Sequence, residues 1–151
     1  HRDRIAPEIV GNIERGLNIS PSQIFEAERI RIELFKRVLD FFETHDFLVC
    51  PAASIAPFPV DQRYITEIDG KPCETYIDWF SITFALTMTA CPTISVPCGF
   101  TSEGLPVGVQ IMGKPRGEAA LLQVAKQFEQ AIGMSKKLPI TPKTNLGNNS
   151  E

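Results

Sequence analysis

Apolar and polar positions repeat along the chain in blocks that predict helices and short strands. Apolar residues recur every three or four positions across 21–45, which predicts a long amphipathic helix. Ser20 and Gln23 form a Ser-x-x-Gln capping box at its start, with Pro21 in the first turn. Two more helices are expected: Pro7 to Arg15, closed by Gly16, and Glu118 to Ala131, closed by Gly133.

Short apolar runs between these helices predict strands. Phe47–Cys50 is such a run, and so are Thr93–Val96, closed by Pro97, and Pro106–Met112. The last two are joined by too few residues for a crossover helix, so we expect them to pair antiparallel. Gly108 inside the last strand indicates a close backbone approach or a bulge. A small hairpin is expected around the Asp69-Gly70 turn. The sequence therefore predicts an α/β fold, a mixed β-sheet flanked by helices.

The segment from Thr75 to Ala90 is apolar on nearly all sides and carries no charged residue after Asp78. We expect a helix there that lies inside something larger. The predicted strands also look buried on both faces, and the remaining helices are too few to cover them. This imbalance is typical of a piece of a larger sheet.

Composition narrows the classes of function. The chain has 151 residues, a net charge of −3 and 43% hydrophobic residues, as a globular domain does. No basic run is present, so we expect no binding to nucleic acid or to an anionic membrane. No apolar stretch reaches the length of a membrane span. Residues 1–137 read as one structural segment and 138–151 as a polar, flexible tail. Because the chain opens at His1 rather than methionine, we expect its true N-terminus to be missing or processed.

Candidate chemistry in the chain itself is thin. The four cysteines have neither zinc-site nor disulfide-framework spacing, and their apolar neighbours indicate buried, reduced thiols in a cytoplasmic protein. His45 at a helix end is best explained as a cation at the C-terminal pole of the helix dipole. A cysteine hydrolase that pairs Cys91 or Cys98 with His45 stays a weaker alternative, and it requires a thiol–imidazole contact.

Two stretches carry a resemblance to a known family. The run Ala90-Cys91-Pro92-Thr93-Ile94-Ser95-Val96-Pro97-Cys98-Gly99-Phe100, followed by the run from Gly104 to Gly113, resembles the C-terminal core of the amidase signature family. The run from Asp46 to Pro51, with Ala56-Pro57, is similar to that family's strand and loop after a long helix. The likeness covers about residues 1–140.

The resemblance implies amide hydrolysis by a Ser–cis-Ser–Lys triad, in which the nucleophilic serine attacks the amide carbonyl and no metal or cofactor is needed. The Gly-Gly-Ser-Ser-Gly-Gly type signature that carries both serines has no counterpart in this sequence, and Lys71, Lys114 and Lys126 match nothing in the motif. No catalytic residue is therefore assigned here. We interpret the chain as the C-terminal portion of an amidase that acts on a small-molecule amide with its N-terminal portion, and we expect the chain alone to be inactive.

The resemblance also places substrate recognition near Tyr76, Asp78 and Trp79. Asp78 either accepts an amide N–H or caps the following helix, and capping is favoured. Trp79 either stacks on a substituent of the substrate or fills the core. Thr87 stands where many relatives have asparagine, which weakens any polar role at that position. The alternative to an amidase is a non-catalytic α/β module that self-associates, for instance as a homodimer, through an exposed strand edge and helix.

Overall fold

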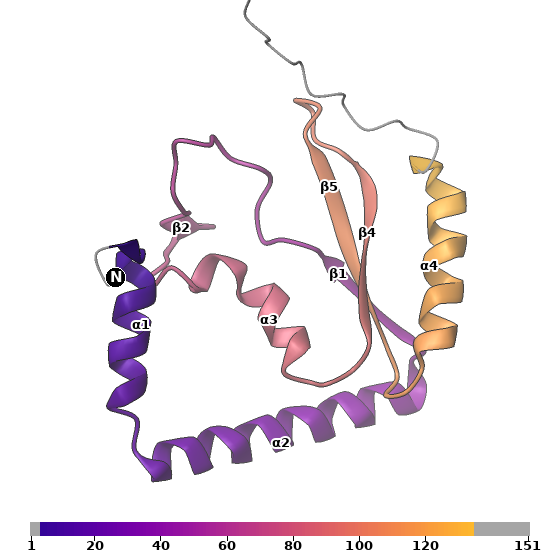
Figure 1. The fold of residues 1–151 in the computed structure, drawn as a ribbon. Helices are drawn as coiled ribbons and strands as arrows, with labels where there is room; N and C mark the ends of the chain where they lie inside the picture. Colours follow the sequence, from indigo (N-terminus) through magenta and orange to yellow (C-terminus); the bar gives the residue numbers. More distant parts are fainter. Residues whose placement is uncertain (1–3, 135–151) are drawn as a thin grey trace, which may run out of the picture.

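The computed structural model describes residues 4–134 and centres on a three-stranded sheet (Figure 1). Its strands are β1 (Phe47–Pro51), β4 (Thr93–Phe100) and β5 (Pro106–Gly113), in the order β1-β5-β4. Both pairs are antiparallel, as expected for β4 and β5. The predicted α/β class and all three strands are confirmed. The outer edges of β1 and β4 pair with no other strand within residues 4–134.

Strand β4 continues beyond the point where the sequence predicts its end. We expected Pro97 to close it after Val96, yet pairing with β5 resumes at Gly99 after a register shift and reaches Phe100. Proline is tolerated because β4 is an edge strand, where a missing N–H need not break a ladder on both sides. Gly108 lies opposite Pro97. A Cβ atom on Gly108 would sit 3.2 Å from the Val96 carbonyl oxygen, so the predicted close approach is confirmed.

One face of the sheet is covered by α4 (Glu118–Ile132). Ile111 of β5 is 1% exposed and packs with Val96, Leu121 and Ala125 in the main hydrophobic cluster. Gly133 follows α4 in the left-handed conformation, with φ 70°, as the predicted stop signal requires. The spacing of apolar residues correctly predicted this helix, and its last residue, Ile132, lies one position beyond the predicted Ala131.

The other face of the sheet meets the C-terminal part of α2 (Pro21–Thr44). Phe42 packs there with Cys91 and with Met112, which is 1% exposed. The capping box at the start of α2 is present: Ser20 Oγ accepts from the Gln23 N–H at 3.3 Å, and Gln23 Oε1 accepts from the Ser20 N–H at 2.8 Å. Phe42 is the one buried residue of this helix, because its N-terminal half extends away from the sheet (Figure 1).

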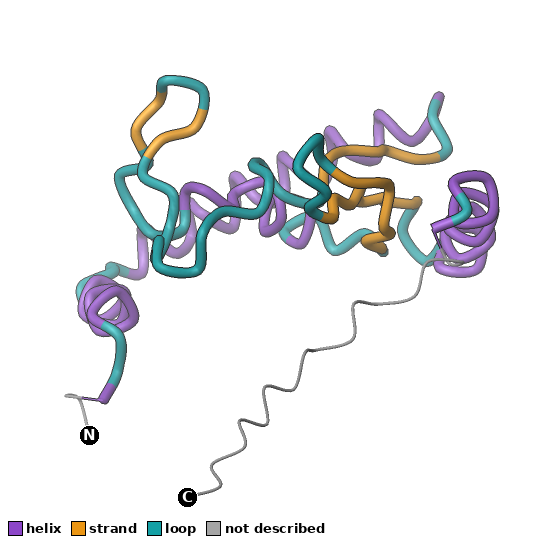
Figure 2. The backbone as a smooth tube through the Cα atoms, turned by 90° about the horizontal axis from the view of Figure 1, so that it is seen from above, coloured by secondary structure: helices purple, strands orange, loops and turns teal. Residues whose placement is uncertain are grey.

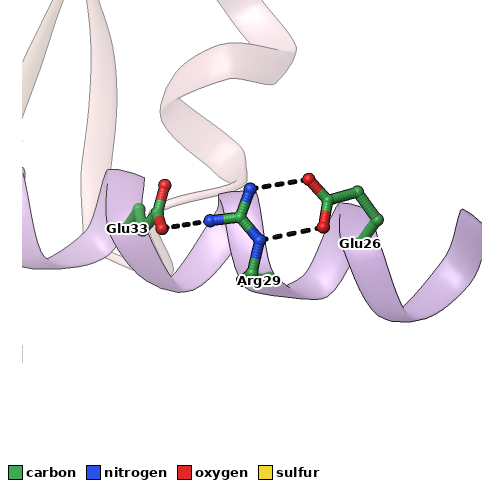
Figure 3. Close-up of polar contacts among 3 residues, drawn as sticks. All are labelled: Glu26, Arg29 and Glu33. Carbon is green, nitrogen blue, oxygen red and sulfur yellow. Dashed lines mark hydrogen bonds and ion pairs between the residues drawn. The ribbon is translucent and has the colours of Figure 1, made fainter.

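The extended half of α2 carries an ion network on its surface (Figure 3). Arg29 donates to Glu26 through Nε at 2.8 Å and Nη2 at 2.6 Å, and it also pairs with Glu33 one turn on. Hydrogen bonding to Arg29 lowers the pKa of Glu26, and the pKa of Arg29 is raised in turn. All three side chains are about half exposed, so water screens the network and it adds little stability.

Helix α1 (Pro7–Leu17) lies at the far end of the molecule from α4 (Figure 2). We expected Gly16 to end this helix, and that prediction was wrong by two residues, because the chain stays helical through Leu17. Asn18 ends the helix instead: its backbone N–H donates to Arg15 O, and its side chain donates to Glu14 O at 2.9 Å. The Glu8–Arg63 ion pair, at 2.7 Å, ties α1 to the loop before the hairpin.

The expected hairpin is present as β2 (Glu67–Ile68) and β3 (Lys71–Pro72). Asp69 and Gly70 between them have φ values of 51° and 73°, the positive angles that a two-residue hairpin turn demands.

The helix expected over Thr75–Ala90 is shorter than predicted. It consists of a 3-10 turn, η2 (Asp78–Phe80), followed by α3 (Ser81–Thr87), and the chain breaks from helix at Ala90, which has φ 55°. We expected a helix covered by something larger, and within this chain no residue of α3 is buried and Phe84 is 39% exposed. The chain supplies too few neighbouring side chains to cover so apolar a helix.

Two further expectations from the sequence concern the C-terminal tail and membrane-spanning segments. The predicted polar tail, 138–151, lies outside the described residues. Within the described part of the chain, no helix is both long enough and apolar enough to cross a membrane.

Candidate functional site

A cavity of about 430 Å³ lies where the chain leaves strand β1. Its walls are the segment Pro51–Phe58, the Trp79 side chain and the start of β5 at Pro106–Gly108. The residues that line it are apolar apart from Ser54 and the backbone, and none of them is charged. Cavities of this kind, apolar with a few polar groups, are typical of small-molecule sites.

A cluster of aromatic side chains forms the wall of this cavity at Trp79. The Trp79 ring meets Phe58 edge to face with centroids 5.6 Å apart, and Phe80 at 5.3 Å. Such edge-to-face pairs fix ring orientation as well as burying area. The Trp79 Nε1 atom is buried and has no hydrogen-bond acceptor among the described residues. The ring is therefore held by aromatic contacts and not by its polar atom.

Tyr76 belongs to a second cavity, of about 450 Å³, on the other side of the aromatic cluster. This cavity lies between α1 and the segment that leads into η2, and its lining includes Asn12, Arg15 and Tyr64. The Tyr76 and Tyr64 rings meet edge to face at 5.8 Å. Tyr76 also contacts Trp79, at 6.5 Å, so the aromatic cluster connects the two cavities.

Asp78 lines neither cavity. Its Oδ2 accepts a hydrogen bond of 2.7 Å from the Thr75 N–H, and Thr75 Oγ1 accepts one of 3.3 Å from the Ile77 N–H. These two bonds hold the turn that presents Tyr76 and Trp79. The expectation that Asp78 caps the following helix is wrong, because neither η2 nor α3 has a side-chain hydrogen bond at its N-cap. The hydrogen bond from the Thr75 backbone lowers the pKa of Asp78. Of the three residues that sequence reasoning singled out, two face different cavities and the third holds the turn between them.

Sequence reasoning missed that Pro51–Phe58 lines the first cavity and that Gln110, outside the lining, holds Pro51. Gln110 is 5% exposed, and its Nε2 donates to the Pro51 carbonyl oxygen at 3.0 Å. One signal for it is present in the sequence, because Gln110 is the single polar side chain within the apolar run 106–112. A buried polar residue of this kind has a specific partner as a rule.

The thiol–imidazole pair that a cysteine hydrolase needs is not formed. The His45 Nδ1 atom contacts the Phe41 carbonyl oxygen at 3.1 Å and Thr44 Oγ1 at 2.9 Å, and its ring stacks on Phe41. Cys91 is buried in the apolar cluster around Phe42. No three side chains of the His, Cys, Asp or Glu type gather to hold a metal within residues 4–134.

Comparison with known proteins decides the family. The family model described as Amidase matches residues 3–122, most of the chain. The chain belongs to the amidase signature family. The stretches that carry the resemblance, 90–100 and 104–113, contain β4, an edge strand of the sheet, and β5, its central strand.

Relatives within the amidase signature family are similar to this chain over only part of their own length. One relative, a subunit of the glutamyl-tRNA(Gln) amidotransferase of Thermodesulfovibrio yellowstonii, is 37% identical over 116 residues, covering 76% of this chain and 22% of that protein. An acylamidase from Rhodococcus erythropolis is 32% identical over 133 residues, covering 87% of this chain and 27% of that protein. The crystal structure of a bacterial aryl acylamidase superposes with a TM-score of 0.81 at 26% identity, covering 90% of this chain and 28% of that one. The chain thus spans about a quarter of the length of these relatives.

Proposed function

We propose that this chain is the C-terminal portion of an amidase that hydrolyses a carboxylic amide to an acid and ammonia. The observation that carries the proposal is the amidase family match over residues 3–122, in a chain that spans only 22–28% of its relatives. The sequence holds no Gly-Gly-Ser-Ser-Gly-Gly type motif, so the nucleophilic serine, the cis-serine and the lysine belong to N-terminal sequence. The partner this portion needs is that N-terminal portion.

This portion supplies one wall of the substrate site. Trp79 and Tyr76 contact the substrate, and Asp78 holds the turn that presents them. The cavity at Trp79 has an uncharged lining, which supports a substrate whose bulk on this side is uncharged and apolar. A charged group there would lose its hydration without gaining a partner. An amide with an aliphatic or aryl substituent therefore suits this cavity better than one with an ionised group close to the amide.

The decisive experiment compares the 151-residue chain with the same chain joined to its N-terminal portion. We expect the joined protein to release ammonia from simple aliphatic and aryl amides, and the 151-residue chain alone to release none. The matched control is the joined protein with the nucleophilic serine of the N-terminal portion changed to alanine, which should also be inactive. Turnover by the purified 151-residue chain would contradict the proposal.

A cytoplasmic location is part of the proposal. All four cysteines are free in the structure, at positions 50, 73, 91 and 98. Proteins of oxidising compartments seldom keep four unpaired thiols, which supports a reducing environment. Detection of the protein in a secreted fraction, with paired thiols, would argue against this location.

A second candidate function is a non-catalytic module that self-associates as a homodimer. The observation that favours it is the apolar stripe on α1, where Ile9 and Ile13 are about half exposed and Leu17 is 81% exposed. Sedimentation at several concentrations separates the two candidates. A dimer whose population rises with concentration, and which stays inactive after it is joined to the N-terminal portion, favours the module. A chain that stays monomeric at every concentration excludes it.

A further inference from the structure

The segment Pro51–Phe58 forms most of the cavity wall, yet its hydrogen bonds lie only at its start, at Pro51 and Ala52. Beyond the end of β1, the Ala52 N–H donates to the Gly108 carbonyl oxygen at 2.9 Å. From Ala53 to Phe58, the structure records no further hydrogen bond between this segment and the described residues. The hydrogen bonds that place this wall are therefore those made by Pro51 and Ala52.

Two side chains from different elements hold this start of the segment. Gln110 of β5 donates from Nε2 to the Pro51 carbonyl oxygen at 3.0 Å. Thr83 of α3 donates from Oγ1 to the Ala52 carbonyl oxygen at 3.4 Å. The two acceptors are consecutive carbonyls, so the sheet and α3 hold the same point of the chain from separate directions. Neither bond belongs to the ladder that makes the sheet.

The start of the segment also packs against the strand β5. A Cβ atom on Gly108 would lie 3.4 Å from Ala52 Cβ and 3.2 Å from the Val96 carbonyl oxygen, so Ala52 rests directly against β5. At its far end the segment returns to the cavity through Phe58, whose ring meets Trp79. A shift at Pro51 and Ala52 is thus passed to the contact between the segment and Trp79.

We propose that Gln110 and Thr83 are positioning residues that fix Pro51 and Ala52, and through them set the shape of the cavity that faces Trp79. As a statement about substrate binding, this inference rests on the proposed amidase function. As a statement about the cavity, it stands on the contacts of this chain alone. The two are tested separately.

The first test uses the 151-residue chain and its single tryptophan, Trp79, as a reporter. Gln110→Met keeps the length of the side chain and removes its donor, and Thr83→Val keeps the shape and removes the hydroxyl. We expect both variants to shift Trp79 emission to longer wavelength and to increase its quenching by acrylamide. Gln130→Met, at an exposed position of α4, is the matched control and should leave both signals unchanged.

The second test uses the chain joined to its N-terminal portion. For an amide with an aryl group that fills the cavity, both variants should raise KM about three- to tenfold, the range that one lost hydrogen bond produces, with kcat nearly unchanged. For a small amide without that group, KM should stay at the parent value. This split separates positioning from a general loss of structure, which would lower activity on both amides.

The outcomes are distinct. If the joined protein hydrolyses no amide, the proposed function is wrong, and Trp79 quenching alone decides the positioning inference. The inference is overturned if both variants quench as the parent does. It is also overturned if Gln110→Met loses helical circular dichroism and activity on both amides while Thr83→Val behaves as the parent, because Gln110 would then serve the stability of the sheet only.

Discussion

Large aliphatic side chains are buried at one end of the molecule and exposed at the other. At the sheet end, Ile111 is 1% exposed and Leu121 is 4% exposed, because α4 and the strands close around them. At the opposite end, α1 buries no residue, and Ile13 remains 53% exposed. The helices α1 and α4 lie far apart at the ends of the chain's long axis (Figure 2). The sheet and α4 form a hydrophobic core within this chain, whereas the apolar side chains of α1 have few neighbours to pack against.

This difference shows that burial is a property of the neighbours and not of the residue. Helix α1 has the apolar spacing of a helix that packs on something, as α4 does. Helix α4 finds the sheet within this chain, but α1 finds only the few residues near Tyr64 and Tyr76. The chain spans about a quarter of its relatives, and under the proposed function further sequence would cover this end. Its apolar side chains are where the N-terminal portion is expected to pack.

The largest effect on the free energy of unfolding is expected at the sheet end, when one isoleucine at each end is truncated to alanine. Ile111→Ala removes a fully buried side chain and leaves a cavity between the sheet and α4, which should lower the free energy of unfolding by about 2–5 kcal/mol. Ile13→Ala removes a half-exposed side chain and should change it by less than about 0.5 kcal/mol. Urea denaturation of the 151-residue chain, followed by circular dichroism, measures both.

The difference between the losses of unfolding free energy in these two variants tests the comparison of the two ends. Equal losses for Ile111→Ala and Ile13→Ala would mean that the α1 end is packed in solution, and the comparison of the two ends would be wrong. In the protein joined to its N-terminal portion, Ile13→Ala should become costly while the loss at Ile111 stays the same. That change would locate where the additional sequence packs.

A smaller effect is expected at the start of α2, where local interactions replace tertiary packing. Ser20→Ala removes the acceptor for the Gln23 N–H and should lower the free energy of unfolding by about 0.5–2 kcal/mol. Ser81→Ala, at an exposed position of α3 where the hydroxyl makes no hydrogen bond to the described residues, makes the same chemical change away from the cap and is the control. If Ser20→Ala has no effect in urea denaturation, the N-terminal half of α2 does not fold together with the sheet.

Much of this fold follows from local signals in the sequence. The capping box sets the start of α2, Asp69-Gly70 sets the hairpin, and Gly133 sets the end of α4, because each of these signals acts within a few residues. The errors occur where distant contacts decide. Pro97 does not end β4, since pairing with β5 continues past it. The exposure of α3 depends on which other elements pack against it, and the spacing of apolar residues in the sequence does not say which elements those are.

The candidate site was only partly predictable for the same reason. The family resemblance pointed to Tyr76 and Trp79, but the turn that Asp78 holds directs them to different cavities. Gln110 is far along the chain from Pro51, and only the pairing of β1 with β5 brings the two together. Spacing along one element does not reveal a contact between two elements.

The smallest effect tests Asp78, which lies between the two ends and is held by a polar contact and not by burial. The Thr75 N–H bond lowers the pKa of Asp78 below its ordinary value of 3.8, so the ionised carboxylate stabilises the fold at pH values above 3.8. This stabilisation is lost as the pH falls through the lowered pKa. Asp78→Asn keeps an acceptor and removes the charge, so it should be less stable than the parent at pH 7, with the difference vanishing in acid.

Urea midpoints measured from pH 7 down to pH 2 follow this difference, because the pKa of Asp78 lies below 3.8. Asp61→Asn is the control, because the Asp61 carboxylate has no hydrogen bond among the described residues, and its midpoint difference from the parent should not change with pH in the same way. A difference at Asp78 that is constant across the range would mean that geometry alone holds the turn. A difference that disappears in acid would mean that the charge of the Asp78 carboxylate stabilises the turn. The turn that presents Tyr76 and Trp79 would then loosen at low pH, while the core around Ile111 stays packed.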